Sequence, residues 1–189
     1  MRLNLTVATR DGTEFVRRVE AESGQKVADC YQCGKCTAGC PVTFAMDLMP
    51  HQVVRLLQLG LGDEILESKT IWLCSTCATC TTRCPRNIDL ARLMDTLRST
   101  ARSAGRTKAG KGIAQFNEVF LDSVRRYGRA HELGIGLRYN LKTGKLFKDS
   151  DLARGWFLRG RLKVAVPKIR GVAEIDRIFN EIKRMEGGK

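Results

Sequence analysis

The chain has 189 residues and 43% of them are hydrophobic, so it can bury a core and is too apolar to be wholly disordered. No run approaches the roughly 18 consecutive apolar residues of a membrane-spanning helix, and the first residues lack the apolar stretch of a secretory signal. We therefore expect a cytoplasmic protein, because disulfides are rare in that compartment and cysteine-rich chains there usually bind metal.

The net charge of +13 comes from one part of the chain. Residues 1–97 contain 11 Lys/Arg and 11 Asp/Glu, and residues 171–189 contain four of each. Residues 98–170 contain 18 Lys/Arg against 5 Asp/Glu, and they carry the whole excess. Such a localised basic region suggests an acidic protein surface, a nucleic acid or a membrane surface as its partner.

The first segment, residues 1–25, is predicted to form a short β-hairpin. Apolar and polar residues alternate over residues 3–7, Asp11-Gly12 is a typical turn pair, and residues 13–19 would return as the second strand. A hairpin of this size is marginal alone, so it would pack either on the rest of the chain or on another protein of a complex.

The second segment, residues 26–104, holds all eight cysteines and is predicted to be mainly helical. Apolar residues cluster at helical spacing between the two cysteine groups. They do so again over roughly residues 88–103, which predicts an amphipathic helix after the second group.

The third segment, residues 105–189, is predicted to be a basic helical extension without cysteine. Glycines lead into an amphipathic helix over residues 113–128, and a last helix lies near the C-terminus. We expect this extension to dock onto a partner protein, with Trp156 and the nearby arginines as buried anchors. The alternative is a self-contained helical subdomain whose basic face is merely solvated.

Both cysteine groups follow the pattern C-x₂-C-x₂-C-x₃-C-P, which is typical of 4Fe–4S binding. Two residues between successive cysteines let the backbone curl around a cubane, so that three thiolates reach three different irons. The proline turns the chain away after the fourth cysteine, which in two-cluster proteins ligates the other cluster. Structural zinc sites use separated C-x₂-C pairs instead, and they explain this pattern poorly.

The number of cysteines agrees with two cubane clusters, because two such clusters need eight thiolates and the chain has eight cysteines. We predict that one cluster is held by Cys30, Cys33, Cys36 and Cys84, and the other by Cys74, Cys77, Cys80 and Cys40. Lys35, Arg83 and Arg86 are close to these ligands in sequence, and positive charge near a cluster favours its reduced, more negative state.

Two stretches of the chain, CYQCGKCTAGCPV and IWLCSTCATCTTRCPRNIDLARLM, resemble the iron–sulfur C subunit of heterodisulfide reductase. The similarity is good over about residues 25–100 and weak over the extension. It implies an α-helical ferredoxin fold in which helices frame two 4Fe–4S clusters bound by all eight cysteines. It also implies that the chain relays electrons between two partner proteins of one complex. One partner contains flavin and iron–sulfur clusters, and the other reduces a disulfide at clusters held by Cys-Cys-Gly motifs.

The sequence contains neither a Cys-Cys-Gly motif nor a G-x-G-x-x-G dinucleotide fingerprint. We therefore expect an electron-carrying subunit of a hetero-oligomeric oxidoreductase, without catalytic residues of its own. An alternative is the iron–sulfur subunit of a glycolate, lactate or glycerol-3-phosphate type dehydrogenase, which uses a similar module. A nucleic-acid-binding protein with structural clusters is disfavoured, because only the basic stretch 98–170 supports it and no recognised binding motif is present.

Overall fold

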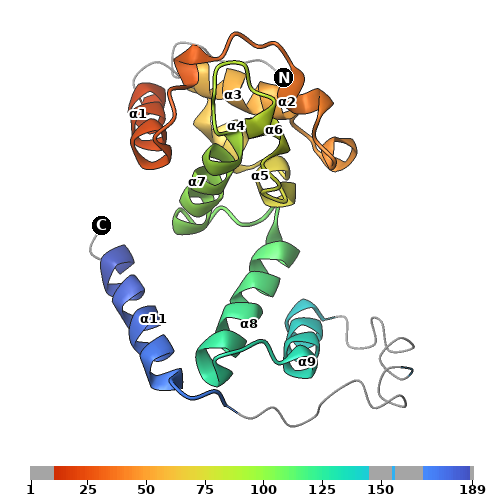
Figure 1. Ribbon diagram of the computed structural model, residues 1–189, viewed down its shortest axis with the longest axis vertical. Coiled ribbons are helices and arrows are strands. Elements are labelled where there is room, and N and C mark those ends of the chain that lie inside the picture. The colour runs from red at the N-terminus through yellow and green to blue at the C-terminus, as the bar shows by residue number, and fades with distance from the viewer. Residues whose placement is uncertain (1–10, 145–154, 156–167, 188–189) are drawn as a thin grey trace. The chain divides into compact units, whose positions relative to one another are not determined.

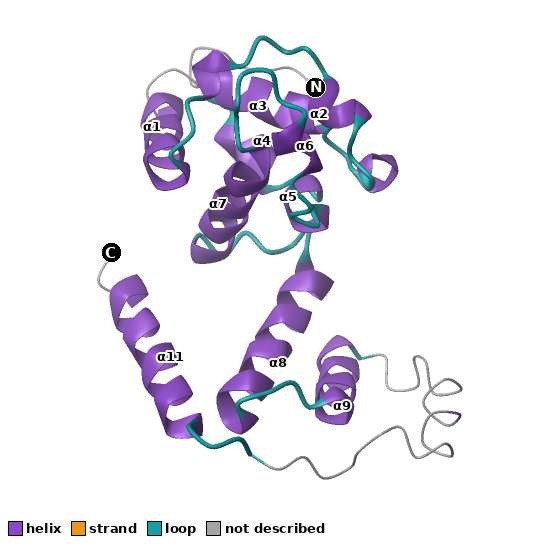
Figure 2. Ribbon diagram, in the orientation of Figure 1, coloured by secondary structure: helices purple, strands orange, loops and turns teal. Residues whose placement is uncertain are grey.

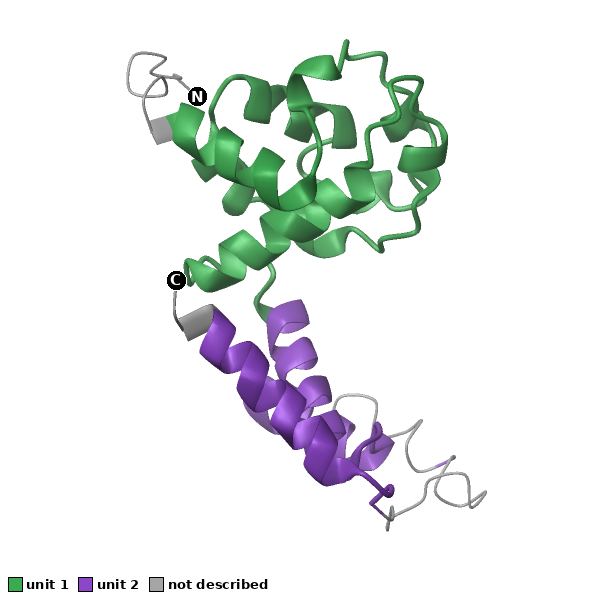
Figure 3. Ribbon diagram, turned by 60° about the vertical axis from the view of Figure 1, so that its left-hand side comes forward, with its two compact units in different colours: residues 1–111 green, residues 112–189 purple. Residues whose placement is uncertain are grey.

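The computed structural model describes residues 11–144, 155 and 168–187, and the chain divides into two compact units, residues 1–111 and 112–189 (Figure 3). The elements within the described residues are helices and no strand occurs among them (Figure 2). The prediction of a mainly helical protein is therefore confirmed. None of the helices in the described part of the chain is long and apolar enough to cross a bilayer.

The first unit carries the cysteines on short helices and on the loops between them (Figure 1). Its elements are α1 (Asp11–Ser23), η1 (Val27–Asp29), α2 (Lys35–Ala38), η2 (Thr43–Ala45), α3 (Pro50–Gln58), α4 (Gly62–Leu66), α5 (Thr70–Leu73), α6 (Thr79–Thr82) and α7 (Leu90–Ser103).

Helix α7 is the centre of the first unit, since it contacts α1, α4, α5 and α6. Leu90, Leu93, Met94 and Leu97 form its buried face. They recur at the spacing that places side chains on one side of a helix, and the helix matches the one predicted over residues 88–103. Its first turn is capped by Asp89, whose carboxylate accepts the Arg92 N–H at 3.0 Å.

The predicted N-terminal β-hairpin is wrong for the residues that the structure describes. Residues 11–20, assigned to the turn and the second strand, belong to helix α1. The predicted first strand, residues 3–7, lies outside the described residues. The helix forms because Val19 and Ser23, one helical turn apart, are fully buried where α1 contacts α7 and α4.

Gly12 shows why the turn signal misled the sequence analysis. A Cβ atom added to Gly12 would lie 2.4 Å from the carbonyl oxygen of Gly60, just beyond the end of α3. Glycine at this position therefore allows two backbones to approach closely, and it does not mark the tip of a hairpin.

The second unit consists, in its described part, of α8 (Lys111–Tyr127), α9 (Glu132–Thr143) and α11 (Val172–Gly187). The edge of one aromatic ring, Phe116 or Tyr139, meets the face of the other, with 5.8 Å between the ring centroids, and this contact joins α8 to α9. Arg125 on α8 joins α8 to α11, because its guanidinium donates to Asp176 and Asn180.

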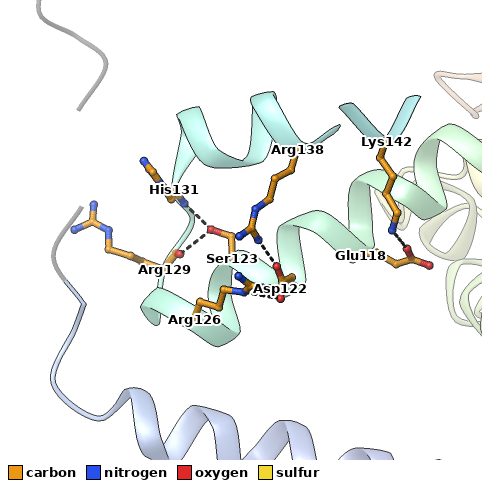
Figure 4. A network of polar contacts seen from close by, with 8 residues as sticks. All are labelled: Glu118, Asp122, Ser123, Arg126, Arg129, His131, Arg138 and Lys142. Atoms are coloured by element: carbon orange, nitrogen blue, oxygen red, sulfur yellow. Dashed lines mark hydrogen bonds and ion pairs between the residues drawn. The ribbon is translucent and has the colours of Figure 1, made fainter. Parts of the chain in front are cut away.

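A polar network reinforces the contact between α8 and α9 (Figure 4). The Asp122 carboxylate pairs with Arg126 on its own helix and with Arg138 on α9, and Lys142 pairs with Glu118. The described helices of the extension thus have packing of their own. Trp156 and the arginines beside it, which we predicted to be docking anchors, lie outside the described residues.

Candidate iron–sulfur site

The two cysteine motifs fold in the same way, with corresponding residues 44 positions apart. A helical turn precedes the first cysteine of each motif, η1 before Cys30 and α5 before Cys74. A second short helix carries the third cysteine, Cys36 on α2 and Cys80 on α6. The sequence analysis compared only the cysteine spacings and missed that the flanking structure repeats as well.

The backbone of each motif passes twice through the left-handed region, on either side of the second cysteine. The φ angles are +62° at Gln32 and +76° at Gly34 in the first motif, and +53° at Thr76 and +58° at Ala78 in the second. A left-handed residue reverses the direction of the chain, so cysteines three positions apart turn toward a common centre. For a non-glycine residue this conformation costs about 1–2 kcal/mol, and ligation of a cluster would hold it in place.

The second motif and Cys40 share one small cavity. The sulfur-bearing residues of its wall are Cys40, Cys74, Cys77 and Cys80, and apolar residues such as Val42, Met46 and Met94 complete it. The structure therefore brings the fourth cysteine of the first motif to the three leading cysteines of the second. This grouping is the one predicted for the second cluster.

Near the first motif, Cys84 approaches residues that are far from it in sequence. Desolvation of the hydroxyl raises the pKa of Tyr31, and the nearby sulfurs of Cys33 and Cys84 raise it further. The backbone N–H of Ile88 donates to Cys84 Sγ at 3.3 Å and fixes this side chain. The fourth cysteine of the second motif thus lies beside the first motif, as predicted for the first cluster.

None of the eight cysteines, all within the described residues, forms a disulfide. Burial raises the pKa of the Cys36, Cys74 and Cys80 thiols, so their deprotonation would be coupled to metal binding. Cys77 is exposed, and its hydrogen bond with the Thr79 hydroxyl at 3.4 Å lowers its pKa.

In the described part of the chain no three His, Cys, Asp or Glu side chains are close enough to hold a single metal ion. The cysteines of the cavity are thus spaced more widely than ligands of a mononuclear site. A cubane presents a different iron to each thiolate, and it fits this spacing.

Residues 26–88 match the family model of the 4Fe–4S dicluster domain. This part of the chain is a 4Fe–4S dicluster domain. Its cofactors are two 4Fe–4S clusters, as the cysteine count predicted.

The dicluster domain lies in the region that the chain shares with curated relatives. Identity is 35% over 104 residues with the C subunit of the H(2):CoB-CoM heterodisulfide,ferredoxin reductase of Methanothermobacter marburgensis, covering 54% of this chain and 56% of the relative. It is 39% over 106 residues with the iron–sulfur C subunit of the CoB–CoM heterodisulfide reductase of Methanopyrus kandleri, covering 55% of each chain. It is 38% over 119 residues with the second C subunit of the same reductase of Methanocaldococcus jannaschii, covering 63% and 56%. The chain spans about half the length of these relatives, and its resemblance to the C subunit of heterodisulfide reductase is confirmed.

Two carboxylates that the sequence analysis did not consider hold the helical turns ahead of the first cysteines. Glu20 Oε1 accepts the Val27 N–H at 2.8 Å, at the start of η1. Asp47 accepts the Lys69 N–H at 2.8 Å and the Thr70 N–H at 3.0 Å, at the start of α5. Asp47 lies more than 20 residues from these partners in sequence, so no local capping pattern announces it.

We expect Asp47→Ala to destabilise the dicluster domain by about 1 kcal/mol, the usual cost of losing a helix cap. Partial burial alone would raise the pKa of Asp47, but the hydrogen bonds from Lys69 and Thr70 outweigh it and hold the pKa below its ordinary value. The stabilisation by Asp47 is therefore present above its unfolded-state pKa of about 3.9 and is lost as the pH falls through the lower, folded-state pKa.

Anaerobic thermal unfolding of the wild type and of Asp47→Ala measures this contribution. The difference in Tm should be constant from about pH 8 to about pH 5, because Asp47 is ionised in both the folded and the unfolded state over this range. Asp47→Asn, which keeps one oxygen acceptor, should lose less than Asp47→Ala. Equal Tm values for wild type and Asp47→Ala at neutral pH would show that the cap contributes nothing.

Proposed function

We propose that this chain is the electron-transfer subunit of a heterodisulfide-reductase-type complex, in which it relays electrons between a flavin-containing partner and a disulfide-reducing partner with Cys-Cys-Gly motifs. The observation that carries the proposal is the dicluster domain, in which two 4Fe–4S clusters account for all eight cysteines. No thiol is left over to form a redox-active disulfide. The names of the relatives, each the C subunit of a heterodisulfide reductase, support the same role.

We assign the ligands as the sequence predicted, with the fourth cysteine of each motif exchanged between clusters. The first cluster takes Cys30, Cys33, Cys36 and Cys84, and the second takes Cys74, Cys77, Cys80 and Cys40. The cavity that joins Cys40 to the second motif supports this assignment. So does the position of Cys84 beside Tyr31. Bound in this way, each cluster supplies one-electron chemistry, and the protein holds both clusters within one domain.

Exposure of the ligands is consistent with a relay. Cys33 of the first set and Cys77 of the second are exposed, whereas the other six cysteines are only partly so. Each cluster therefore has one edge near solvent, where the redox centre of another protein can approach. Since electron transfer slows steeply with distance, an electron could enter at one edge and leave at the other.

We also propose that the second unit docks the domain onto its partner subunits. On α11, Ile178, Ile182 and Met185 are 55%, 47% and 69% exposed, and they recur at helical spacing along one side. Exposed apolar stripes of this kind mark interaction surfaces. The basic residues of the extension would orient the encounter with an acidic partner surface.

Purification under anaerobic conditions tests the proposed function. The protein should contain about eight iron and about eight acid-labile sulfide per chain, and it should co-purify with a flavoprotein and with a Cys-Cys-Gly protein. Alone, it should exchange electrons with artificial carriers and reduce no disulfide. Disulfide reduction by the pure chain would contradict the relay role. Co-purification with a 2-hydroxy-acid dehydrogenase instead would favour the alternative oxidoreductase.

A further inference from the structure

Two long side chains outside the motifs make matching hydrogen bonds to the backbone around the first cysteines. Gln58 Nε2, at the end of α3, donates to the carbonyl oxygens of Val27 and Cys30, both at 2.8 Å. Arg98, on α7, donates from Nε to the carbonyl oxygen of Ile71 and from Nη2 to that of Cys74, again at 2.8 Å. In both cases the acceptors are the first cysteine of a motif and the residue three positions before it.

The two side chains are structural equivalents. Val27 and Ile71 lie 44 positions apart, as do Cys30 and Cys74. Gln58 and Arg98 each lie eight residues after the first residue of their helix. Each side chain thus ties the turn that leads into a motif to the helix that follows that motif. The structural task is the same, but glutamine is neutral and arginine carries a full positive charge.

We propose that Gln58 and Arg98 are positioning residues for the two clusters, and that their difference in charge raises the reduction potential of the cluster bound by Cys74 relative to the cluster bound by Cys30. Reduction makes a cluster more negative, so a fixed cation nearby stabilises its reduced state. An electron that enters the domain is then biased toward the second cluster. This inference rests on the proposed function, because it assumes the two clusters and their exchanged ligands.

Burial makes Arg98 the most effective of the nearby cations. Its side chain is 21% exposed, whereas Lys35, Arg83 and Arg86 are all exposed, and solvent and salt screen exposed charges. Asp95 lies 3.9 Å from the Arg98 guanidinium and offsets part of its field. The Asp95 side chain is 69% exposed, so solvent weakens that offset.

Arg86, near the first cluster, is balanced by an acidic partner. Its guanidinium lies 3.7 Å from the Asp29 carboxylate, and the two side chains are 53% and 48% exposed. The pair is therefore close to neutral and well solvated, and it adds little to the potential of the first cluster.

Exchanging the two residues in the full-length chain tests the inference. Potentiometric titration followed by electron paramagnetic resonance gives the midpoint potential of each cluster. Arg98→Gln should lower the potential of the second cluster relative to the first, changing the constant for electron partition between them by about tenfold, or about 59 mV for a one-electron couple. Gln58→Arg should raise the potential of the first cluster by a similar amount. Arg98→Lys, which keeps the charge, should stay close to the wild type.

Arg102→Gln is the matched control, because it removes an exposed charge from the same helix α7. It should leave both potentials unchanged, and a shift as large as that of Arg98→Gln would overturn the inference. So would Arg98→Gln protein with both clusters and unaltered potentials. If Arg98→Gln loses the second cluster, Gln58→Arg decides, since an unaltered potential of the first cluster then overturns the inference. Wild-type protein without about eight iron per chain would instead refute the proposed function.

Discussion

Cys84→Ser should abolish the cluster of the first motif, although Cys84 belongs to the second motif in the sequence. Its sulfur lies beside Tyr31 and near Cys33, and the Ile88 N–H holds it there. Serine keeps the size of the side chain but is a poor ligand for iron compared with a thiolate. We expect the variant to retain about four of its eight iron atoms.

Cys40→Ser is the reciprocal variant and should abolish the cluster of the second motif, because Cys40 completes the cavity formed by Cys74, Cys77 and Cys80. Cys30→Ser and Cys74→Ser serve as controls, since each removes the leading ligand of one cluster and so assigns the two sets of spectroscopic signals. Cys84→Ser should therefore resemble Cys30→Ser, and Cys40→Ser should resemble Cys74→Ser. The opposite pairing would mean that each motif holds a cluster by itself.

The cysteine motifs could be recognised from the sequence because their chemistry depends on short spacings along the chain. Three thiolates from one turn of backbone reach one cubane only at separations of about three residues, so the pattern is local and specific. The helix over residues 88–103 was equally accessible, since Leu90, Leu93 and Leu97 recur with the period of a buried helical face. In both cases the signal and the structure that it specifies occupy the same few residues.

The residues that hold the motifs could not be found in this way. Gln58 lies 28 residues from Cys30, and Arg98 lies 24 residues from Cys74. Their role emerges only when α3 and α7 return to the turns that precede the cysteines. Helix α1 was missed for a related reason, because its packing on α7 and α4 decides between helix and hairpin, and a local Asp-Gly pair does not.

Substitution of the exposed isoleucines of α11 should weaken assembly with the partner subunits. The opposite side of this helix is occupied within the second unit, where Arg125 of α8 bonds Asp176 and Asn180. Ile178 and Ile182 take no part in those hydrogen bonds and are about half exposed. Burial of the remaining half against a partner would contribute about 1 kcal/mol for each side chain. The double variant Ile178→Gln/Ile182→Gln should therefore bind roughly thirtyfold more weakly.

Glutamine is the replacement of choice because it forms helices well and adds no charge, so α11 should persist and circular dichroism should be unchanged. Arg184→Gln is the matched control, since Arg184 lies on the same helix, is 80% exposed and pairs only with Glu181. Anaerobic binding measurements should show wild-type affinity for the control and weaker binding for the double variant. Added salt should slow association in every case, because it screens the basic residues that orient docking, but it should leave the ratio of the affinities unchanged. Wild-type affinity of the double variant would mean that the second unit is a self-contained helical subdomain and that another surface binds the partner.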